Sequence, residues 1–139
     1  MQDKLERSVG YALVRAFRAA NRATSRALLP FALSAEQAHI LLALWIEGPM
    51  KVGELQKILA LGSGTLTGAL DRMDKAGLVR RVPDPEDGRA WRVEPAPMDR
   101  KKRLAIERTL EEVEKRVFSA LSRDERTVLL RLLGKLDGG

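Results

Sequence analysis

The sequence of 139 residues contains no cysteine and a single histidine, His39. Without cysteine the chain cannot form disulfides, thiolate metal sites or a thiol redox sensor. A histidine-rich metal site would have to borrow ligands from a second subunit, so we interpret His39 as a helix-surface or interface residue and predict no metal and no cofactor. No nucleophile lies at a recognisable spacing from a base, which argues against an enzyme.

Long apolar runs are also missing. No run approaches the roughly 20 residues that span a bilayer, and residues 1–22 lack the apolar core of a signal peptide. The sequence therefore predicts a cytoplasmic protein with no membrane partner.

Charge is abundant and unbalanced. The formal net charge is +6 and the pI is about 10.1, which favours a polyanionic partner because a basic surface attracts phosphate at long range. Hydrophobic residues make up 45% of the chain, enough for one compact domain with or without helical extensions.

Hydrophobic periodicity predicts a series of helices. Residues 3–29 carry an amphipathic stripe that stops near Pro30, and Ser34 with Gln37 forms a capping box for a second helix ending at Gly48. A third helix spans 52–59. A fourth begins with Ser63 as its N-cap and ends at 76, where Gly77 takes a left-handed conformation. Its inward face is formed by Leu66, Ala69, Leu70 and Met73.

The second half of the chain predicts a hairpin and two more helices. Strands at 78–82 and 90–94 flank the turn-rich segment "PDPEDGR". A long helix then runs from Pro97 to about Leu121, and Ser122 with Glu125 caps the last one. The fold class is mainly α with a small two- or three-stranded antiparallel wing, a winged helix-turn-helix plus a helical region. The terminal helices expose apolar seams that a second copy would cover, which predicts a homodimer.

The segment "KVGELQKILALGSGTLTGALDRMDKAGLVRRVPDPEDGR" resembles the MarR family of bacterial transcriptional regulators, most specifically in "AGLVRRVPDPEDGR". The resemblance implies a homodimeric repressor of transcription with helical dimerisation segments at 1–33 and 97–139 and a DNA-binding winged helix-turn-helix domain at 34–96. It implies binding of double-stranded DNA at a pseudo-palindromic operator, with release by a small ligand in many members. The alternative is a winged-helix protein-interaction module without specific DNA binding.

The resemblance also assigns roles in the wing. The family's Asp-x-Arg element matches Asp87 and Arg89, where the arginine reaches the minor groove and the aspartate holds it. Gly88 replaces a frequent arginine. The segment "PAPMDR" at 95–100 departs from the family's Leu-Thr-x-x-Gly-Arg, and Pro95 cannot donate to a ladder. This departure leaves open the length of the second wing strand and the start of the next helix.

The expected recognition helix has a first turn of small residues, which would let it sink into the major groove and meet base edges. Ser63 is equally well explained as a cap. The other hydroxyls could be solvent-exposed, and the wing tip could be a solvated turn with a local Asp87–Arg89 pair. Of Arg80 and Arg81, strand alternation sends only one toward phosphate. The predicted DNA-binding residues are Ser63, Thr65, Thr67, Gly68, Arg72, Arg80, Arg81, Asp87 and Arg89.

A ligand site is not defined by the sequence. Tyr11, Phe17 and Phe31 fit either ordinary core packing or a pocket for a small aromatic ligand, which the family commonly binds. Trp45 and Met73 are better explained as core. The basic run "DRKKRL" at 99–104 fits a solvated helix start or a phosphate contact equally well.

Overall fold

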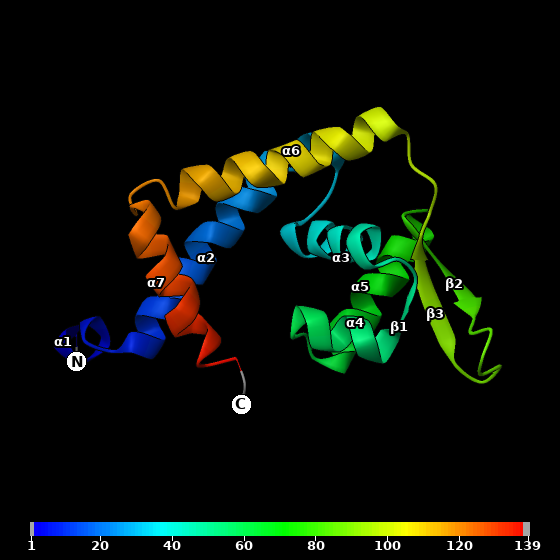
Figure 1. The fold of residues 1–139 in the computed structure, drawn as a ribbon, viewed down its shortest axis with the longest axis horizontal. Coiled ribbons are helices and arrows are strands. Elements are labelled where there is room, and N and C mark those ends of the chain that lie inside the picture. Colours follow the sequence, from blue (N-terminus) through cyan, green and yellow to red (C-terminus); the bar gives the residue numbers. More distant parts are fainter. Residues whose placement is uncertain (1, 138–139) are drawn as a thin grey trace. The chain divides into compact units, whose positions relative to one another are not determined.

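The computed structural model describes residues 2–137 and consists of two compact units. One unit comprises Leu28–Glu107, and the other combines the chain up to Ala27 with the chain from Arg108 onward. The structure is mainly helical with one small three-stranded antiparallel sheet (Figure 1). The predicted fold class is confirmed. Within residues 2–137 there is no helix whose length and apolar content would suit a membrane crossing.

The Leu28–Glu107 unit contains the predicted winged helix-turn-helix. Its core joins leucines of three helices to valines of the sheet, and Leu41, Leu55, Leu66, Val79 and Val93 are all at most 1% exposed. Its elements in chain order are the 3-10 turn η1 (Leu29–Phe31), α3 (Ala35–Glu47), β1 (Met50–Lys51), α4 (Val52–Leu59), α5 (Ser63–Lys75), β2 (Val79–Pro83), β3 (Trp91–Pro95) and the start of α6 (Arg100–Val117).

The capping box predicted for α3 is present. The Ser34 hydroxyl accepts the backbone N–H of Gln37 at 3.1 Å, and the Gln37 side chain accepts the N–H of Ser34 at 3.1 Å. These two bonds satisfy donors that would otherwise lack partners at the helix start. The helix ends at Glu47, and Gly48 follows it at a φ of 83°.

The turn between α4 and α5 corrects the predicted start of the recognition helix. Gly62, not Ser63, is the N-cap, and its carbonyl accepts the N–H of Leu66 at 3.0 Å. The preceding turn is made by Ala60, which takes a left-handed φ of 53° and leads into an extended Gly62. This tight turn starts the helix one residue early, so Ser63 is already helical and provides no cap. Gly77 adopts the predicted left-handed conformation, with a φ of 74°.

The sheet has the order β1-β3-β2, so the short β1 adds a third strand beside the hairpin. Both wing strands lie one residue later than predicted. Pro95 does not shorten the second strand: it pairs with Val79, and the next residue, Ala96, donates to the carbonyl of Leu78 at 2.9 Å. Because N–H groups alternate between the two sides of a strand, the missing donor of Pro95 lies on the side away from β2.

Helix α6 begins at Arg100, three residues later than predicted, because Asp99 caps it. The Asp99 carboxylate accepts the N–H of Lys102 at 3.3 Å, and its carbonyl accepts the N–H of Arg103 at 3.0 Å. The predicted end near Leu121 is also wrong. The helix stops at Val117, and turns at 118–121 lead to α7 (Arg123–Gly134), whose Ser122–Glu125 capping box is confirmed.

The second unit contains α1 (Gln2–Glu6), α2 (Val9–Ala27), the later part of α6, and α7. The single helix predicted for 3–29 is wrong. The Ser8 hydroxyl accepts the N–H of Tyr11 at 3.2 Å and so starts a new helix after the α1 turn, as a serine N-cap does. Gly10, a poor helix former, lies in the same first turn.

Apolar side chains of this unit lie on its surface. Helix α2 lies entirely within the described residues and contains no buried residue. Val9 and Phe17 are 78% and 65% exposed. Leu130 of α7 is 73% exposed. A shallow hollow lies between α2 and α7. It is lined by Leu13, Leu130, Leu133, Gly134, Leu136 and Asp137. The apolar seams expected from the sequence are therefore present and uncovered in a single chain.

Candidate nucleic-acid interface

Helix α5 has a buried face and an exposed polar face. Leu66, Ala69, Leu70 and Met73 are at most 1% exposed, as the periodicity predicts. On the opposite face Ser63, Thr65, Thr67 and Arg72 are exposed, and Gly68 is half-buried. The fold therefore presents to solvent a row of short hydroxyl side chains, followed by the charged residues Asp71, Arg72, Asp74 and Lys75. Their contact with DNA stays a prediction.

The glycines of this face are not required by packing inside the protein. A Cβ added at Gly64 would meet no atom within 4 Å, and one at Gly68 would meet only the Arg72 guanidinium, at an ordinary 3.4 Å. Glycine within a helix costs about 0.5–1 kcal/mol relative to alanine. The helix thus carries an energetic cost that no internal contact explains.

Arg80 and Arg81 point to opposite faces of the wing and both meet a carboxylate of the same chain. The guanidinium of Arg81 contacts Asp71 of α5. Arg80 forms an ion pair with Glu94, its cross-strand neighbour, at 3.3 Å. Strand alternation is therefore as predicted, and the face toward α5 belongs to Arg81. Neither arginine is an isolated cation, which the sequence did not indicate.

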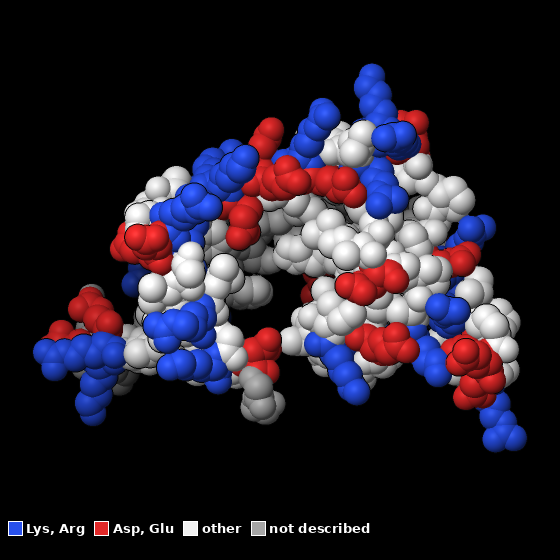
Figure 2. Space-filling model, in the orientation of Figure 1, with Lys and Arg blue, Asp and Glu red and all other residues white. Residues whose placement is uncertain are grey.

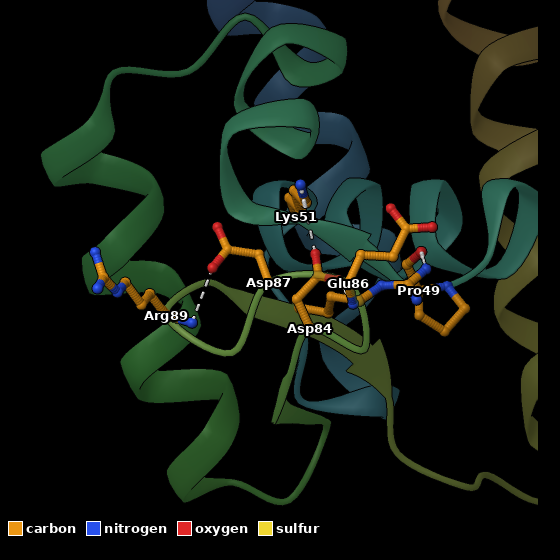
Figure 3. A network of polar contacts seen from close by, with 7 residues as sticks. Pro49, Lys51, Asp84, Glu86, Asp87 and Arg89 are labelled. Atoms are coloured by element: carbon orange, nitrogen blue, oxygen red, sulfur yellow. Dashed lines mark hydrogen bonds and ion pairs between the residues drawn. The ribbon is translucent and has the colours of Figure 1, made fainter.

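The wing tip is organised by two aspartates (Figure 3). The Asp84 carboxylate accepts the N–H of Glu86 at 2.8 Å, and the Asp87 carboxylate accepts the N–H of Arg89 at 3.0 Å. The Asp87–Arg89 contact thus involves the arginine backbone, while the Arg89 side chain extends away from Asp87 in Figure 3. Asp87 shapes the turn and leaves the exposed guanidinium available for another partner.

Asp84 is a residue of the wing that the sequence reasoning missed. It is only 6% exposed and forms an ion pair with Lys51 of β1 at 3.5 Å. The N–H of Glu86, and after it the charge of Lys51, hold the pKa of the Asp84 carboxyl below its ordinary value. The signal that could have found Asp84 is its place between two prolines, since aspartate commonly accepts a backbone N–H two residues later.

A second contact connects the wing to the start of α4. Arg92 of β3 donates to the carbonyl of Pro49 at 2.8 Å. Together with the Lys51–Asp84 pair, this bond fastens β3 and the wing tip to the segment that precedes α4. These contacts join residues 43 and 33 positions apart, so no local sequence pattern reveals them.

Other predicted candidates have ordinary structural environments. Met73 is fully buried, as predicted. Trp45 is half-buried, and its ring lies under the guanidinium of Arg103 at 5.0 Å from the centroid. Arg103 also meets Glu107 at 3.2 Å, so it joins Asp99, the cap of α6, as a member of the 99–104 run with an internal role. His39 is exposed, and the described residues contain no cluster of three or more metal-binding side chains.

The aromatic residues suggested for a ligand pocket belong to different units. Tyr11 and Phe17 lie on α2 and are 38% and 65% exposed, while Phe31 is half-buried in the Leu28–Glu107 unit. The choice between core packing and ligand binding is not tested by these environments.

Charge on the described surface is mixed rather than uniformly positive. Figure 2 shows basic and acidic side chains together over α6 and over the wing. Among the predicted contact residues, Arg72 and Arg89 are exposed, whereas Arg80 and Arg81 are paired. The net charge of +6 is therefore a poor guide to the number of arginines on this face that can attract phosphate.

Comparison with known proteins finds similar transcriptional regulators. Residues 33–91 match the family model described as "MarR family". The HTH-type transcriptional regulator MgrA of Staphylococcus aureus is 30% identical over 136 residues, covering 97% of this chain and 91% of MgrA. The uncharacterized HTH-type transcriptional regulator YcgE of Bacillus subtilis is 33% identical over 88 residues, which span 63% of this chain and 57% of YcgE.

Solved structures share the fold over most of their length. A mutant of MarR from Escherichia coli, complexed with operator DNA, superposes with a TM-score of 0.79 at 25% identity, covering 92% of each chain. BpsR from Bordetella bronchiseptica, whose DNA binding is regulated by 6-hydroxynicotinic acid, gives a TM-score of 0.83 at 25% identity, covering 96% of this chain and 95% of that chain. The winged helix, the exposed polar face of α5 and a relative matched over nearly its whole length agree: this chain belongs to the MarR family of transcriptional regulators.

Proposed function

We propose that this protein is a homodimeric repressor that reads a pseudo-palindromic operator in double-stranded DNA. The observation that carries the proposal is the two-sided α5. Its buried leucines fix the helix, and the exposed side of its first half holds only hydroxyl side chains and glycines, with Arg72 following one turn later. Short side chains allow close approach to base edges in the major groove, and threonine methyls can touch thymine. The operator-bound MarR structure supports the same assignment.

The proposed contacts are divided between two grooves. Ser63, Thr65 and Thr67 would meet base edges or nearby phosphates, and Gly68 would permit close approach of the backbone. Arg72 would bind phosphate or guanine. Arg89 would enter the minor groove, where negative potential is strongest when the groove is narrow. Asp87 would hold that turn through the backbone N–H of Arg89.

Dimerisation would cover the apolar faces of α2 and α7. Leu13 of α2 lines one hollow with Leu130, Leu133 and Leu136 within this unit, and a two-fold axis lets the same surface cover itself. Two winged units would then read half-sites about one helical turn, roughly 34 Å, apart. A small aromatic acid would release the dimer by favouring a conformation with lower operator affinity, in line with the regulation of BpsR.

Selection from random duplexes tests this function directly. The expected result is a palindromic consensus, and a protein-interaction module would yield none. Affinity for the selected duplex should fall steeply with salt because arginines displace condensed counterions. The variants R72A and R89A should each weaken binding and lower the salt slope by about one per protomer. An affinity that hardly changes between low and moderate salt would contradict the proposal.

A further inference from the structure

Beside the exposed face of α5 lies a shallow hollow whose aromatic residue, Trp91, is not among the predicted DNA contacts. It is lined by Val52, Thr67, Leu70, Arg81 and Trp91. These residues come from α4, α5, β2 and β3, all within the Leu28–Glu107 unit. The hollow is therefore a feature of one compact body.

Trp91 gives this hollow an aromatic wall. The residue is 57% exposed, although an indole offers a large apolar area and an N–H donor to any partner that covers it. Its register opposite Pro83 places it on the same sheet face as Arg81 and Val93. That is the face on which Arg81 meets Asp71 of α5, so the indole borders the gap between wing and recognition helix.

The polar lining of the hollow carries little net charge. Arg81 is paired with Asp71, and Thr67 contributes a neutral hydroxyl. Exposed cations on the neighbouring elements include Arg72 on α5 and Arg89 at the wing tip. The hollow itself therefore offers no unpaired charge to a phosphate. It suits an uncharged group that lies between anionic groups.

A DNA backbone has this alternation, because each deoxyribose presents an apolar C–H face and ring oxygen between two phosphates. We propose that Trp91, with Thr67 and the paired Arg81, binds one deoxyribose of the strand that passes between α5 and the wing, while Arg72 and Arg89 neutralise nearby phosphates. This inference rests on the proposed function, and it adds a contact that positions the protein without reading sequence, since every nucleotide offers the same sugar.

Tryptophan fluorescence provides the main test. The chain has two tryptophans, and W45F leaves Trp91 as the sole emitter while keeping an aromatic ring beneath Arg103. Titration of W45F with the selected duplex, and with an unrelated duplex at lower salt, is followed by Trp91 emission and by anisotropy of labelled DNA. We expect Trp91 emission to change with the same midpoint as the anisotropy on both duplexes.

Substitution at Trp91 gives an independent measure. W91A should weaken binding about three- to tenfold on both duplexes, with an unchanged salt slope because no charge is removed. W91F should restore most of the affinity. The control I58A removes another apolar side chain of this unit, 54% exposed on α4, and should leave affinity unchanged. Thermal melting checks the fold, and the W45F titration decides the question if W91A is unstable.

Two failures are distinguishable. Saturable duplex binding with no change in Trp91 emission, or with W91A equal to wild type, overturns the deoxyribose seat and leaves the proposed function intact. Absence of duplex binding by the wild-type protein overturns the proposed function and this inference with it.

Discussion

The guanidinium of Arg81 on β2 contacts the carboxylate of Asp71 on the exposed side of α5. This ion pair connects the wing to the proposed recognition helix and cancels two charges on the face expected to meet DNA. Its partners are 33% and 53% exposed, so the pair itself should stabilise the fold by about 1 kcal/mol or less. Its larger effect should be on DNA affinity.

The variant Asp71→Asn should therefore bind DNA more tightly than wild type. It removes a negative charge facing the phosphates and releases Arg81 to neutralise one, so we expect a two- to fivefold gain, roughly, and a salt slope steeper by about one per protomer. Anisotropy titrations at several salt concentrations measure both. Weaker binding at unchanged thermal stability would show instead that the pair is needed to hold the wing in place.

The variant Gly68→Ala should separate stability from function. In the protein alone it should raise the free energy of unfolding by about 0.5–1 kcal/mol, because its Cβ meets only the Arg72 guanidinium at 3.4 Å. In DNA binding it should lose affinity, because the added methyl group keeps the helix from its closest approach to the groove. Urea unfolding and operator titration give the two quantities.

Gly10→Ala in α2 is the control for that pair of measurements. Its Cβ would make only an ordinary contact with the Ser8 hydroxyl at 3.8 Å, and it lies in the other compact unit. It should not lower DNA affinity. If G68A gains stability and keeps full affinity, close approach at this position is not required.

The elements that could be predicted from sequence are those set by local chemistry. The capping boxes at Ser34 and Ser122 and the left-handed Gly77 depend on neighbours a few residues apart, and each is present. The start predicted for α6 from the nearby prolines is wrong, because Asp99 caps the helix further along the chain.

The parts that could not be predicted depend on contacts between distant segments. Arg81 meets Asp71 because a turn folds the wing strand back against α5, and Lys51 meets Asp84 across the sheet. Strand alternation alone limited the DNA-facing choice to one of Arg80 and Arg81. It did not indicate that both arginines would find carboxylates within the chain.

Acid should loosen the wing through Asp84. Its pKa is lowered by the N–H of Glu86 and then by Lys51, so the carboxylate form is favoured by folding. That stabilisation is complete above the ordinary value of 3.8 and is lost as the pH falls through the lower pKa of the folded protein. The wild type should therefore lose wing stability on acidification, and Asp84→Asn should lack that part of the loss.

Urea unfolding of wild type and D84N at pH 6 and pH 3 measures this difference. The N–H of Ser122 also lowers the pKa of Glu125, so acid removes a stabilising contribution of Glu125 as well. Wild type and D84N lose this contribution equally, and the difference between them therefore isolates Asp84. A stability gap between wild type and D84N that is as large at pH 3 as at pH 6 would show that the carboxylate charge is not the cause.

The variant Leu130→Glu should convert the proposed dimer into monomers. Leu130 is 73% exposed on α7 and borders the hollow shared with α2, so in one chain it supports little of the core. In a two-fold interface it would be buried twice, at about 1.5–3 kcal/mol for each leucine, and glutamate there would place a charge in an apolar contact. Sedimentation equilibrium should show monomers at micromolar concentration, with weaker operator binding because the half-sites are no longer bound by one particle.

The control variant is Arg131→Glu, a charge change on the neighbouring exposed residue of the same helix. It should leave the proposed dimer intact. If L130E stays dimeric, or if wild type is already monomeric, the apolar face of α7 does not hold two copies together, and a different surface would have to set the spacing of the recognition helices.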